Sequence, residues 1–239
     1  MARISVVRHG QASFLAENYD RLSPLGERQS ALLGEHWAAE KLVVDQVYYG
    51  PAERQIRTGE IVGDIYRKAG LGWPEPVTDP DLDEFPAETV ARRFLPELMA
   101  RHPHLAASVA EFQAATEFLS KQRLFDRVLR EVSQRWMEGE VGAPDIPSWR
   151  DFCHRVEGAV NRIRAQAPKS ARVAVFTSGG PTAATARLAL QLSYESTLEL
   201  TWSPRNASVS EFLFNRDRFS LSTFNSTPHL TDPSLLTYR

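Results

Sequence analysis

Apolar residues along the chain recur with two spacings, one typical of buried strands and one typical of amphipathic helices. A short β-branched run at the start stops at Arg8, His9 and Gly10, which predicts a buried strand that ends in a turn. Ser23 and Pro24 then supply a helix N-cap and a first helical residue. The elements expected from this part are a strand over 3–7, a helix over 24–40, a strand over 42–49 and a helix over 51–68. This β-α-β-α order predicts a parallel sheet covered by helices.

The alternation of strands and helices stops at a proline-rich stretch over 73–86. From Ala87 to about Glu140 the pattern is helical throughout, and one segment carries a strongly apolar face. A second stretch rich in glycine and proline, over 142–147, closes this region. We therefore predict a helical insertion above the sheet, over about 86–147.

The last third of the chain returns to the alternating pattern. The elements expected there are a helix over 149–165, a strand over 173–176, a helix after 177–181, and two strands over 208–214 and 219–224. The two final strands are close enough in sequence to form a hairpin. The whole chain, 1–239, is then one α/β domain interrupted by a helical cap.

The composition agrees with this picture and narrows the function. With 239 residues, of which 42% are hydrophobic and 24% charged, the chain can bury a sizeable core as one large domain. The net charge of -2 gives no bulk field for nucleic acid or an anionic membrane, so any anion site is local. Cys153 is the only cysteine, which excludes an internal disulfide and leaves no Cys/His cluster for structural zinc. No apolar stretch is long enough to span a bilayer, and we expect a cytoplasmic protein.

Candidate chemistry gathers where the predicted strands end. In open α/β sheets, ligands bind at the carboxyl ends of the strands. Three such ends carry polar or glycine-containing sequence, over 8–11, 50–54 and 177–181. Exposed amides and helix N-termini favour anions there, and Arg8 and Arg54 add two guanidinium groups. Together these ends predict a site for a dianion of the size of phosphate.

Each of these residues also has a purely structural interpretation. A histidine at a strand end, such as His9, is often structural, and Arg54 alone is typical of a solvated helix face. Glu84 lies in an acidic loop whose usual role is that of a solubilising turn. Ser178 would by default cap the following helix with its hydroxyl. None of these residues is specific by itself, so the argument depends on their order.

That order is informative because several motifs follow one another at consistent places. They are Arg8-His9-Gly10-Gln11, Leu-Ser-Pro-Leu-Gly-Glu-Arg-Gln over 22–29, Pro-x-x-Arg-x-x-x-Thr over 51–58, Asn-Ala-Ser-Val over 206–209 and Asn-Ser-Thr-Pro-His-Leu over 225–230. In this respect the chain resembles the histidine phosphatase superfamily, also called the phosphoglycerate mutase-like family. The resemblance covers nearly the whole chain and is weakest in the helical insertion. It implies a three-layer α/β/α domain with a mostly parallel sheet.

The resemblance also implies a phosphatase mechanism that requires no metal and no cofactor. His9 would attack phosphorus and become a phosphohistidine, while Glu84 would protonate the leaving group and later activate water. The phosphate-binding residues would be Arg8, Gln11, Arg54, Ser178 and Gly179. A neutral imidazole is a suitable nucleophile near pH 7, and covalent capture divides one hard displacement into two easier ones. The expected partner is a small-molecule phosphate ester.

One position departs from the resemblance in a way that concerns activity. The family places a second histidine in a Thr/Ser-His-Gly-Gly sequence, where this chain has Thr177-Ser178-Gly179-Gly180. Serine keeps a hydrogen-bond donor but supplies no positive charge, and losing a preorganised transition-state donor costs roughly 10²–10³ in turnover. Two functions stay open, a phosphomonoester hydrolase of low activity and a non-catalytic protein that binds a phospholigand. A phosphomutase is disfavoured, because the segment after Gln11 lacks the Trp-Asn and Gly-Trp features of phosphoglycerate mutases.

Other readings of the same residues are weaker. Ser178 does not fit the Gly-x-Ser-x-Gly nucleophile elbow, because Phe176 takes the first glycine position. Gly179-Gly180 also lacks the Gly-Lys-Ser/Thr ending of a P-loop. Gly50 stands where the family often has serine, and Arg57 stands where it often has glutamine. Arg57 is then either an added cation for phosphate or a residue of the helix surface.

Three histidines, His102, His104 and His154, are candidates to replace the missing one, although His154 lies on the polar side of its helix and is expected to be solvated. Arg92 and Arg93 of the insertion either meet an acidic substrate group or form a solvated face. The final hairpin is either an edge for a homodimer or a plain sheet edge.

Overall fold

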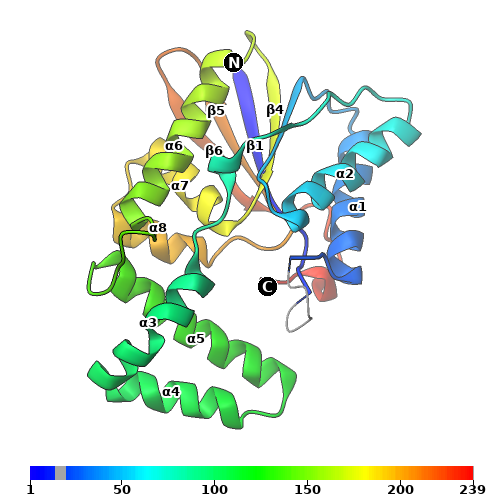
Figure 1. Ribbon diagram of the computed structural model, residues 1–239. Helices are drawn as coiled ribbons and strands as arrows, with labels where there is room; N and C mark the ends of the chain where they lie inside the picture. Colours follow the sequence, from blue (N-terminus) through cyan, green and yellow to red (C-terminus); the bar gives the residue numbers. More distant parts are fainter. Residues whose placement is uncertain (14–19, 239) are drawn as a thin grey trace. The chain divides into compact units, whose positions relative to one another are not determined.

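A computed structural model describes residues 1–13 and 20–238 and divides the chain into two compact units. The first unit joins Met1–Glu84 to the part from Cys153 onward and holds a six-stranded sheet in the order β3-β2-β4-β1-β5-β6 (Figure 1). The strands are β1 (Ala2–Arg8), β2 (Gln46–Tyr49), β3 (Val77–Thr78), β4 (Arg172–Thr177), β5 (Val209–Phe214) and β6 (Phe219–Ser226). β5 runs antiparallel to its neighbours β1 and β6, and the other pairings are parallel. The mostly parallel sheet is confirmed.

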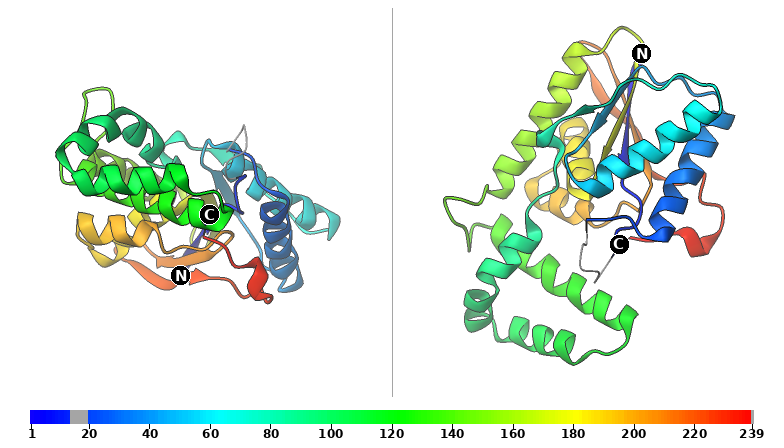
Figure 2. Two further views of the ribbon diagram at one scale, coloured as in Figure 1. Left: turned by 90° about the horizontal axis from the view of Figure 1, so that it is seen from below. Right: turned by 45° about the vertical axis from the view of Figure 1, so that its right-hand side comes forward.

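Helices cover both faces of this sheet. α1 (Pro24–Ala39) and α2 (Glu53–Lys68) lie on one face, and α6 (Trp149–Gln166) and α7 (Gly179–Leu190) lie on the other, as Figures 1 and 2 show. A short α8 (Tyr194–Thr201) follows α7, and two 3-10 turns occupy Pro80–Leu82 and Pro233–Leu235. This arrangement confirms the predicted α/β class with helices on either side of the sheet.

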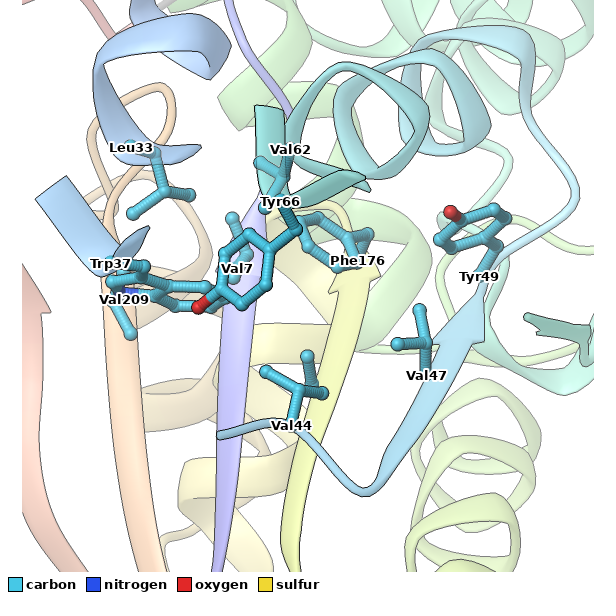
Figure 3. Packing of buried hydrophobic residues seen from close by; sticks show 11 residues of the cluster. Val7, Leu33, Trp37, Val44, Val47, Tyr49, Val62, Tyr66, Phe176 and Val209 are labelled. Atoms are coloured by element: carbon cyan, nitrogen blue, oxygen red, sulfur yellow. The ribbon is translucent and has the colours of Figure 1, made fainter. Parts of the chain in front are cut away.

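The core between the sheet and the first two helices is built from large apolar side chains. Leu33 and Trp37 of α1 and Val62 and Tyr66 of α2 point toward the strands (Figure 3). The strand residues that meet them are Val7, Val47, Tyr49, Ala174, Phe176 and Val209. Burial of each such side chain stabilises the fold by roughly 1.5–3 kcal/mol. The core thereby holds α1 and α2 against the strands whose ends carry the candidate site.

The strand register brings the carboxyl ends of three strands to one edge. Arg8 of β1 pairs with Thr177 of β4, and Tyr49 of β2 pairs with Phe176 of the same strand. The residues that follow β1 and β4, His9 and Ser178, therefore leave the sheet side by side. The predicted convergence of the three strand ends follows from this register.

The second unit, Phe85–Phe152, contains α3 (Ala87–Arg101), α4 (Pro103–Ala114) and α5 (Phe118–Met137). Its aromatic residues form a cluster in which the rings of Phe85, Trp136, Trp149 and Phe152 lie between 5.1 and 6.1 Å apart. This unit spans 85–152, and the insertion expected from the sequence spans about 86–147.

Three elements differ from the sequence prediction. β2 begins at Gln46 rather than at residue 42, because the chain leaves α1 through Lys41 in a left-handed conformation (φ 50°) and the Leu42 amide still bonds to Trp37 O. The two-residue strand β3 and the eight-residue helix α8 were not predicted. Elements this short carry too few periodic positions for a hydrophobic pattern to show them.

Within the described residues, none of the helices combines the length and the apolar content that a bilayer crossing requires.

Candidate active site

His9 is held by backbone bonds at the end of β1. Its amide donates to Thr177 O at 2.8 Å, and its carbonyl accepts from the amide of Ala207 at 3.1 Å. The next residue, Gly10, donates its amide to Thr58 Oγ1 of α2 at 3.1 Å. These contacts anchor His9 to β4, to the start of β5 and to α2, so its position depends on the whole sheet edge.

The imidazole of His9 has a defined tautomer. Its Nδ1 lies 2.7 Å from Gly10 O, and because a carbonyl only accepts, Nδ1 carries the proton. The unprotonated Nε2 then accepts from Arg54 Nε at 3.2 Å. Burial lowers the pKa of His9 well below the usual 6.5, the charges of Arg54 and Arg8 lower it further, and the Gly10 carbonyl acts in the opposite direction. At neutral pH, His9 is a neutral imidazole with a lone pair on Nε2.

The charges of the two predicted arginines both act on this imidazole. Arg54, in the first turn of α2, is 13% exposed and also bonds to the Asp20 carboxylate, which accepts the Glu53 amide at 2.8 Å. Arg8, the last residue of β1, donates to Pro204 O. A Cβ on Gly179 would lie 3.8 Å from Arg8 Nε, which places this guanidinium beside the start of α7. Arg54 therefore meets the lone pair of His9 directly, and Arg8 adds a second positive charge near the ring.

Glu84 reaches the same edge from the loop after β3. Its Oε2 accepts from the amide of Gly180 at 3.1 Å, at the positive end of α7. The loop is held by Thr177 Oγ1, which donates to Leu82 O at 2.6 Å, and by Arg155, which donates to Asp83 O at 3.0 Å. The acidic loop is therefore not a free turn, because its last carboxylate is anchored beside Ser178 and Gly179.

Ser178 occupies the N-cap position of α7, but its side chain makes no capping hydrogen bond. The interpretation of its hydroxyl as a helix cap is wrong. Ser178 is fully buried, and its Oγ accepts from Gln55 Nε2 at 2.7 Å. The hydroxyl therefore faces Gln55, in the first turn of α2.

Gln55 is a buried polar residue of the site that the sequence analysis missed. It lies on the inward face of α2 with Thr58, Gly59 and Val62, spaced as three, four and seven residues along a helix. A glutamine on an otherwise small or apolar face was the signal that could have revealed it.

A second missed group ties the C-terminal segment to the site. Gln29 of α1 accepts the Gln11 amide at 2.8 Å and donates to Leu235 O at 2.7 Å. Asn206 donates to His9 O at 3.3 Å and accepts from Thr237 Oγ1 at 2.9 Å. Both side chains are fully buried, and they hold the backbone around His9.

Gln11 and Arg57 make contacts away from the imidazole. Gln11 Oε1 accepts from Ser23 Oγ at 2.9 Å. Arg57 is 45% exposed and pairs with Glu27 at 3.4 Å and Glu60 at 3.5 Å, as expected for a residue of the helix surface.

The candidate replacement histidines have other partners. His102 bonds to Glu140 at 2.7 Å and His104 bonds to Glu131, both within the helical unit. His154 is exposed and its Nε2 lies 3.0 Å from Tyr194 Oη. Arg93 pairs with Asp145 at 2.9 Å within the helical unit. The segment after Gln11 lies partly outside the described residues, over 14–19, so only its sequence bears on the comparison with phosphomutases.

The arrangement combines an uncharged nucleophile, two guanidinium groups and a carboxylate at a helix N-terminus. Such a set can bind a phosphoryl group, accept it on nitrogen and supply a proton to a leaving group. Among the described residues, no group of three or more His, Cys, Asp or Glu side chains is arranged to hold a metal ion.

A comparison with known families identifies the superfamily of this chain. The model of the histidine phosphatase superfamily, branch 1, matches residues 4–138 and 116–227. The chain belongs to this superfamily. No curated protein matches it.

Several solved structures share the fold at low sequence identity. A mycobacterial glucosyl-3-phosphoglycerate phosphatase is 18% identical with a TM-score of 0.60, over 95% of this chain and 100% of that chain. A phosphoserine phosphatase from Entamoeba histolytica, in complex with phosphoserine, is 17% identical with a TM-score of 0.62, over 96% and 100%. A phosphoglycerate mutase from Bacillus anthracis is 15% identical with a TM-score of 0.61, over 96% and 95%. Phosphatases and a mutase thus share this fold.

Proposed function

We propose that this chain hydrolyses small phosphate monoesters through a phosphohistidine at His9. The observation that carries the proposal is the state of this imidazole, which is buried, protonated on Nδ1, bonded to Arg54 and under the charge of Arg8. A neutral nitrogen with a free electron pair attacks phosphorus, whereas an imidazolium does not.

In the first half-reaction, the Nε2 lone pair of His9 forms a bond to phosphorus while the bond from phosphorus to the ester oxygen breaks. Glu84, in its protonated form, gives its proton to the departing alkoxide, so the alcohol leaves neutral. Arg8 and Arg54 offset the charge on the phosphoryl oxygens. For this, Arg54 has to transfer its Nε hydrogen bond from His9 to the phosphoryl group.

In the second half-reaction, water attacks the phosphohistidine. The Glu84 carboxylate takes one proton from the water, the new oxygen bonds to phosphorus, and the bond to Nε2 breaks. Inorganic phosphate leaves, and His9 regains its lone pair while Glu84 regains its proton. The helix N-terminus beside Glu84 holds the carboxylate at a fixed place for both steps.

The test uses p-nitrophenyl phosphate in EDTA, with a rapid quench to trap the phosphoenzyme. His9→Ala is expected to abolish the acid-labile phosphoenzyme and to lower kcat by about 10³-fold or more, because the nucleophile is gone. His154→Ala is the matched control, since this histidine is exposed on α6 and bonds to Tyr194. Phosphate release that survives His9→Ala would overturn the mechanism.

The substrate class is proposed from the same site and from the relatives that share the fold. A panel of phosphoserine, 3-phosphoglycerate and glucosyl-3-phosphoglycerate covers compounds that appear with those relatives.

A second function is favoured by one observation, the serine at position 178. If the chain binds inorganic phosphate but forms no phosphoenzyme with any ester of the panel, it is a phospholigand-binding protein. Binding measured by calorimetry, beside the quench experiment on the same preparation, separates the two functions.

A further inference from the structure

We propose that Gln55 is a positioning residue that fixes the Ser178 hydroxyl as a hydrogen-bond donor to a phosphoryl oxygen. The inference rests on the proposed function in that its ligand is a phosphoryl group at His9. It assigns a role to a buried glutamine that the chemistry of His9, Arg8, Arg54 and Glu84 does not use.

The direction of the hydrogen bond between Gln55 and Ser178 follows from the partners of the amide. The amide of Ala52 can only donate, and it lies 3.1 Å from one terminal atom of Gln55, which must therefore be the carbonyl Oε1. The other terminal atom, Nε2, then donates to Ser178 Oγ at 2.7 Å. Ser178 is the acceptor in this bond, so its own proton remains for a different partner.

Within the described residues, the bond from Gln55 is the one hydrogen bond that the Ser178 hydroxyl makes. Both side chains have no exposed surface. A buried hydroxyl whose acceptor side is occupied and whose donor side is not is suited to a ligand that accepts a hydrogen bond.

The surroundings of Ser178 identify the chemistry of that ligand. Ser178 follows β4 directly beside His9, because Arg8 and Thr177 are partners in the strand register. The residue after it, Gly179, lies next to Arg8 Nε. The residue before Gln55 is Arg54, which bonds to His9 Nε2. The hydrogen bond between Gln55 and Ser178 thus joins the N-terminal turns of α2 and α7, close to Arg54, Arg8 and His9. A phosphoryl oxygen is the acceptor to be expected there.

Gly50 provides the room for this arrangement. A Cβ at position 50 would lie 2.1 Å from Gln55 Oε1, so a side chain there would displace the amide. Gly50 and Ser178 are two of the positions at which the sequence departs from the motifs it resembles. The two departures are connected in the structure, because Gln55 contacts both positions. Its Oε1 fills the space that a side chain at Gly50 would need, and its Nε2 bonds to the Ser178 hydroxyl.

The chemical consequence concerns charge. Gln55 and Ser178 supply a donor that does not titrate and carries no charge, beside the guanidinium groups of Arg8 and Arg54. The donor contributes a directed hydrogen bond to a charged oxygen, which is worth roughly 10–100-fold in affinity.

The experiment is a double-mutant cycle with Gln55→Met, Ser178→Ala and the double variant. Gln55→Met keeps the length of the side chain and removes its polar atoms. Binding of inorganic phosphate and of orthovanadate is measured by calorimetry, and kcat and KM are measured with p-nitrophenyl phosphate. Gln46→Met, at the amino end of β2, is the matched control.

If Gln55 acts through Ser178, each single variant weakens vanadate binding by roughly 10–100-fold and the double variant is no weaker than either. If Gln55 had a merely structural role, Gln55→Met would lower the midpoint of urea unfolding. The affinity losses of the two single variants would then multiply in the double variant. Unchanged vanadate binding in Gln55→Met, or multiplying losses, would overturn the inference. If the wild type binds phosphate but shows no turnover, only the proposed hydrolase activity is refuted, because the mutant cycle can still be measured from anion binding. If the wild type binds neither phosphate nor orthovanadate, the inference itself is overturned.

A second comparison uses the histidine that the family motif would place at 178. In Ser178→His, an imidazole with the χ1 of the serine would enter the space of the Gln55 amide, 2.7 Å away. We expect this single variant to bind vanadate more weakly than wild type, and Ser178→His with Gln55→Ala to recover at least tenfold. If the single variant gains affinity while Gln55 is present, Gln55 does not occupy that space in solution and the inference fails.

Discussion

Two buried imidazoles, His9 and His229, stay neutral for related reasons. Burial lowers the pKa of both, and neighbouring positive charge adds to this effect, from Arg54 and Arg8 for His9 and from His36 for His229. The pKa of His229 falls to about 4, and its ring lies 6.2 Å from that of His36. In the unfolded chain both side chains return to about 6.5. Below that pH the unfolded state binds more protons than the native state.

This difference predicts how stability depends on pH. The contribution of His229 is complete above pH 6.5 and is lost as the pH falls toward 4, because protonation then favours the unfolded chain. His229→Asn should reduce the decrease in unfolding free energy between pH 7.5 and 4.5 by about 2–3 kcal/mol. Urea titrations at several pH values measure it, with the exposed His154→Asn as control. An unchanged pH dependence in His229→Asn would mean that His229 titrates normally in the native protein.

At the scale of elements, the turn after β1 depends on close backbone contact with the first turn of α1. A Cβ on Gly10 would lie 2.3 Å from Gly26 O, and a Cβ on Gly26 would lie 2.1 Å from Gln11 O. The Ser23 side chain caps α1 by accepting the Gly26 amide at 3.1 Å. The two glycines therefore let β1 and α1 approach at the point where His9 is presented.

Substitution of Gly10 tests this contact. Gly10→Ala should lower the unfolding free energy by about 1–3 kcal/mol, because the added methyl group would clash with the backbone carbonyl of Gly26. Gly158→Ala is the matched control in α6, where the added Cβ meets its nearest atom at 3.6 Å. This control should raise stability by about 0.5–1 kcal/mol, as alanine does in a helix interior. Equal effects of the two variants would contradict the close approach.

The sequence predicted the long elements well and the short ones poorly. α1, α2 and α6 were predicted to within two residues at each end, because caps and apolar spacing are local properties of the chain. β3 and α8 are held by neighbours in space, as the pairing of Tyr49 with Thr78 shows. Such elements depend on contacts that a local pattern does not contain.

At the scale of the whole molecule, the chain leaves the sheet unit after Glu84 and returns to it at Cys153. Arg155, just after the return, donates to Pro80 O at 2.8 Å and to Asp83 O at 3.0 Å, just before the exit. The residues before the exit and after the return are therefore close enough for one arginine side chain to connect them, and a short linker can join the two ends.

Replacing Phe85–Phe152 by such a linker tests whether the sheet unit folds and binds a phosphate analogue by itself. The sheet unit keeps the core under α1 and α2 together with His9, Arg8, Arg54 and Glu84, so the shortened chain should fold and bind orthovanadate within about tenfold of wild type. A shortened chain that folds but binds orthovanadate far more weakly than wild type would show that the sheet unit alone does not hold the anion site.

The sequence by itself determined the class of fold and the family, because strand-end motifs and helix caps consist of neighbouring residues. The resemblance that these motifs carry then made His9, Arg8, Arg54 and Glu84 the candidates. The tertiary structure decided how these groups meet. Gln55 and Ser178 are 123 residues apart, and Glu84 and Gly180 are 96 apart. Contacts over such separations depend on the order and register of β1, β2 and β4, which bring the three strand ends to one edge. The hydrogen bond of the Ser178 hydroxyl was therefore invisible in the sequence, where the same residue looked like a helix cap.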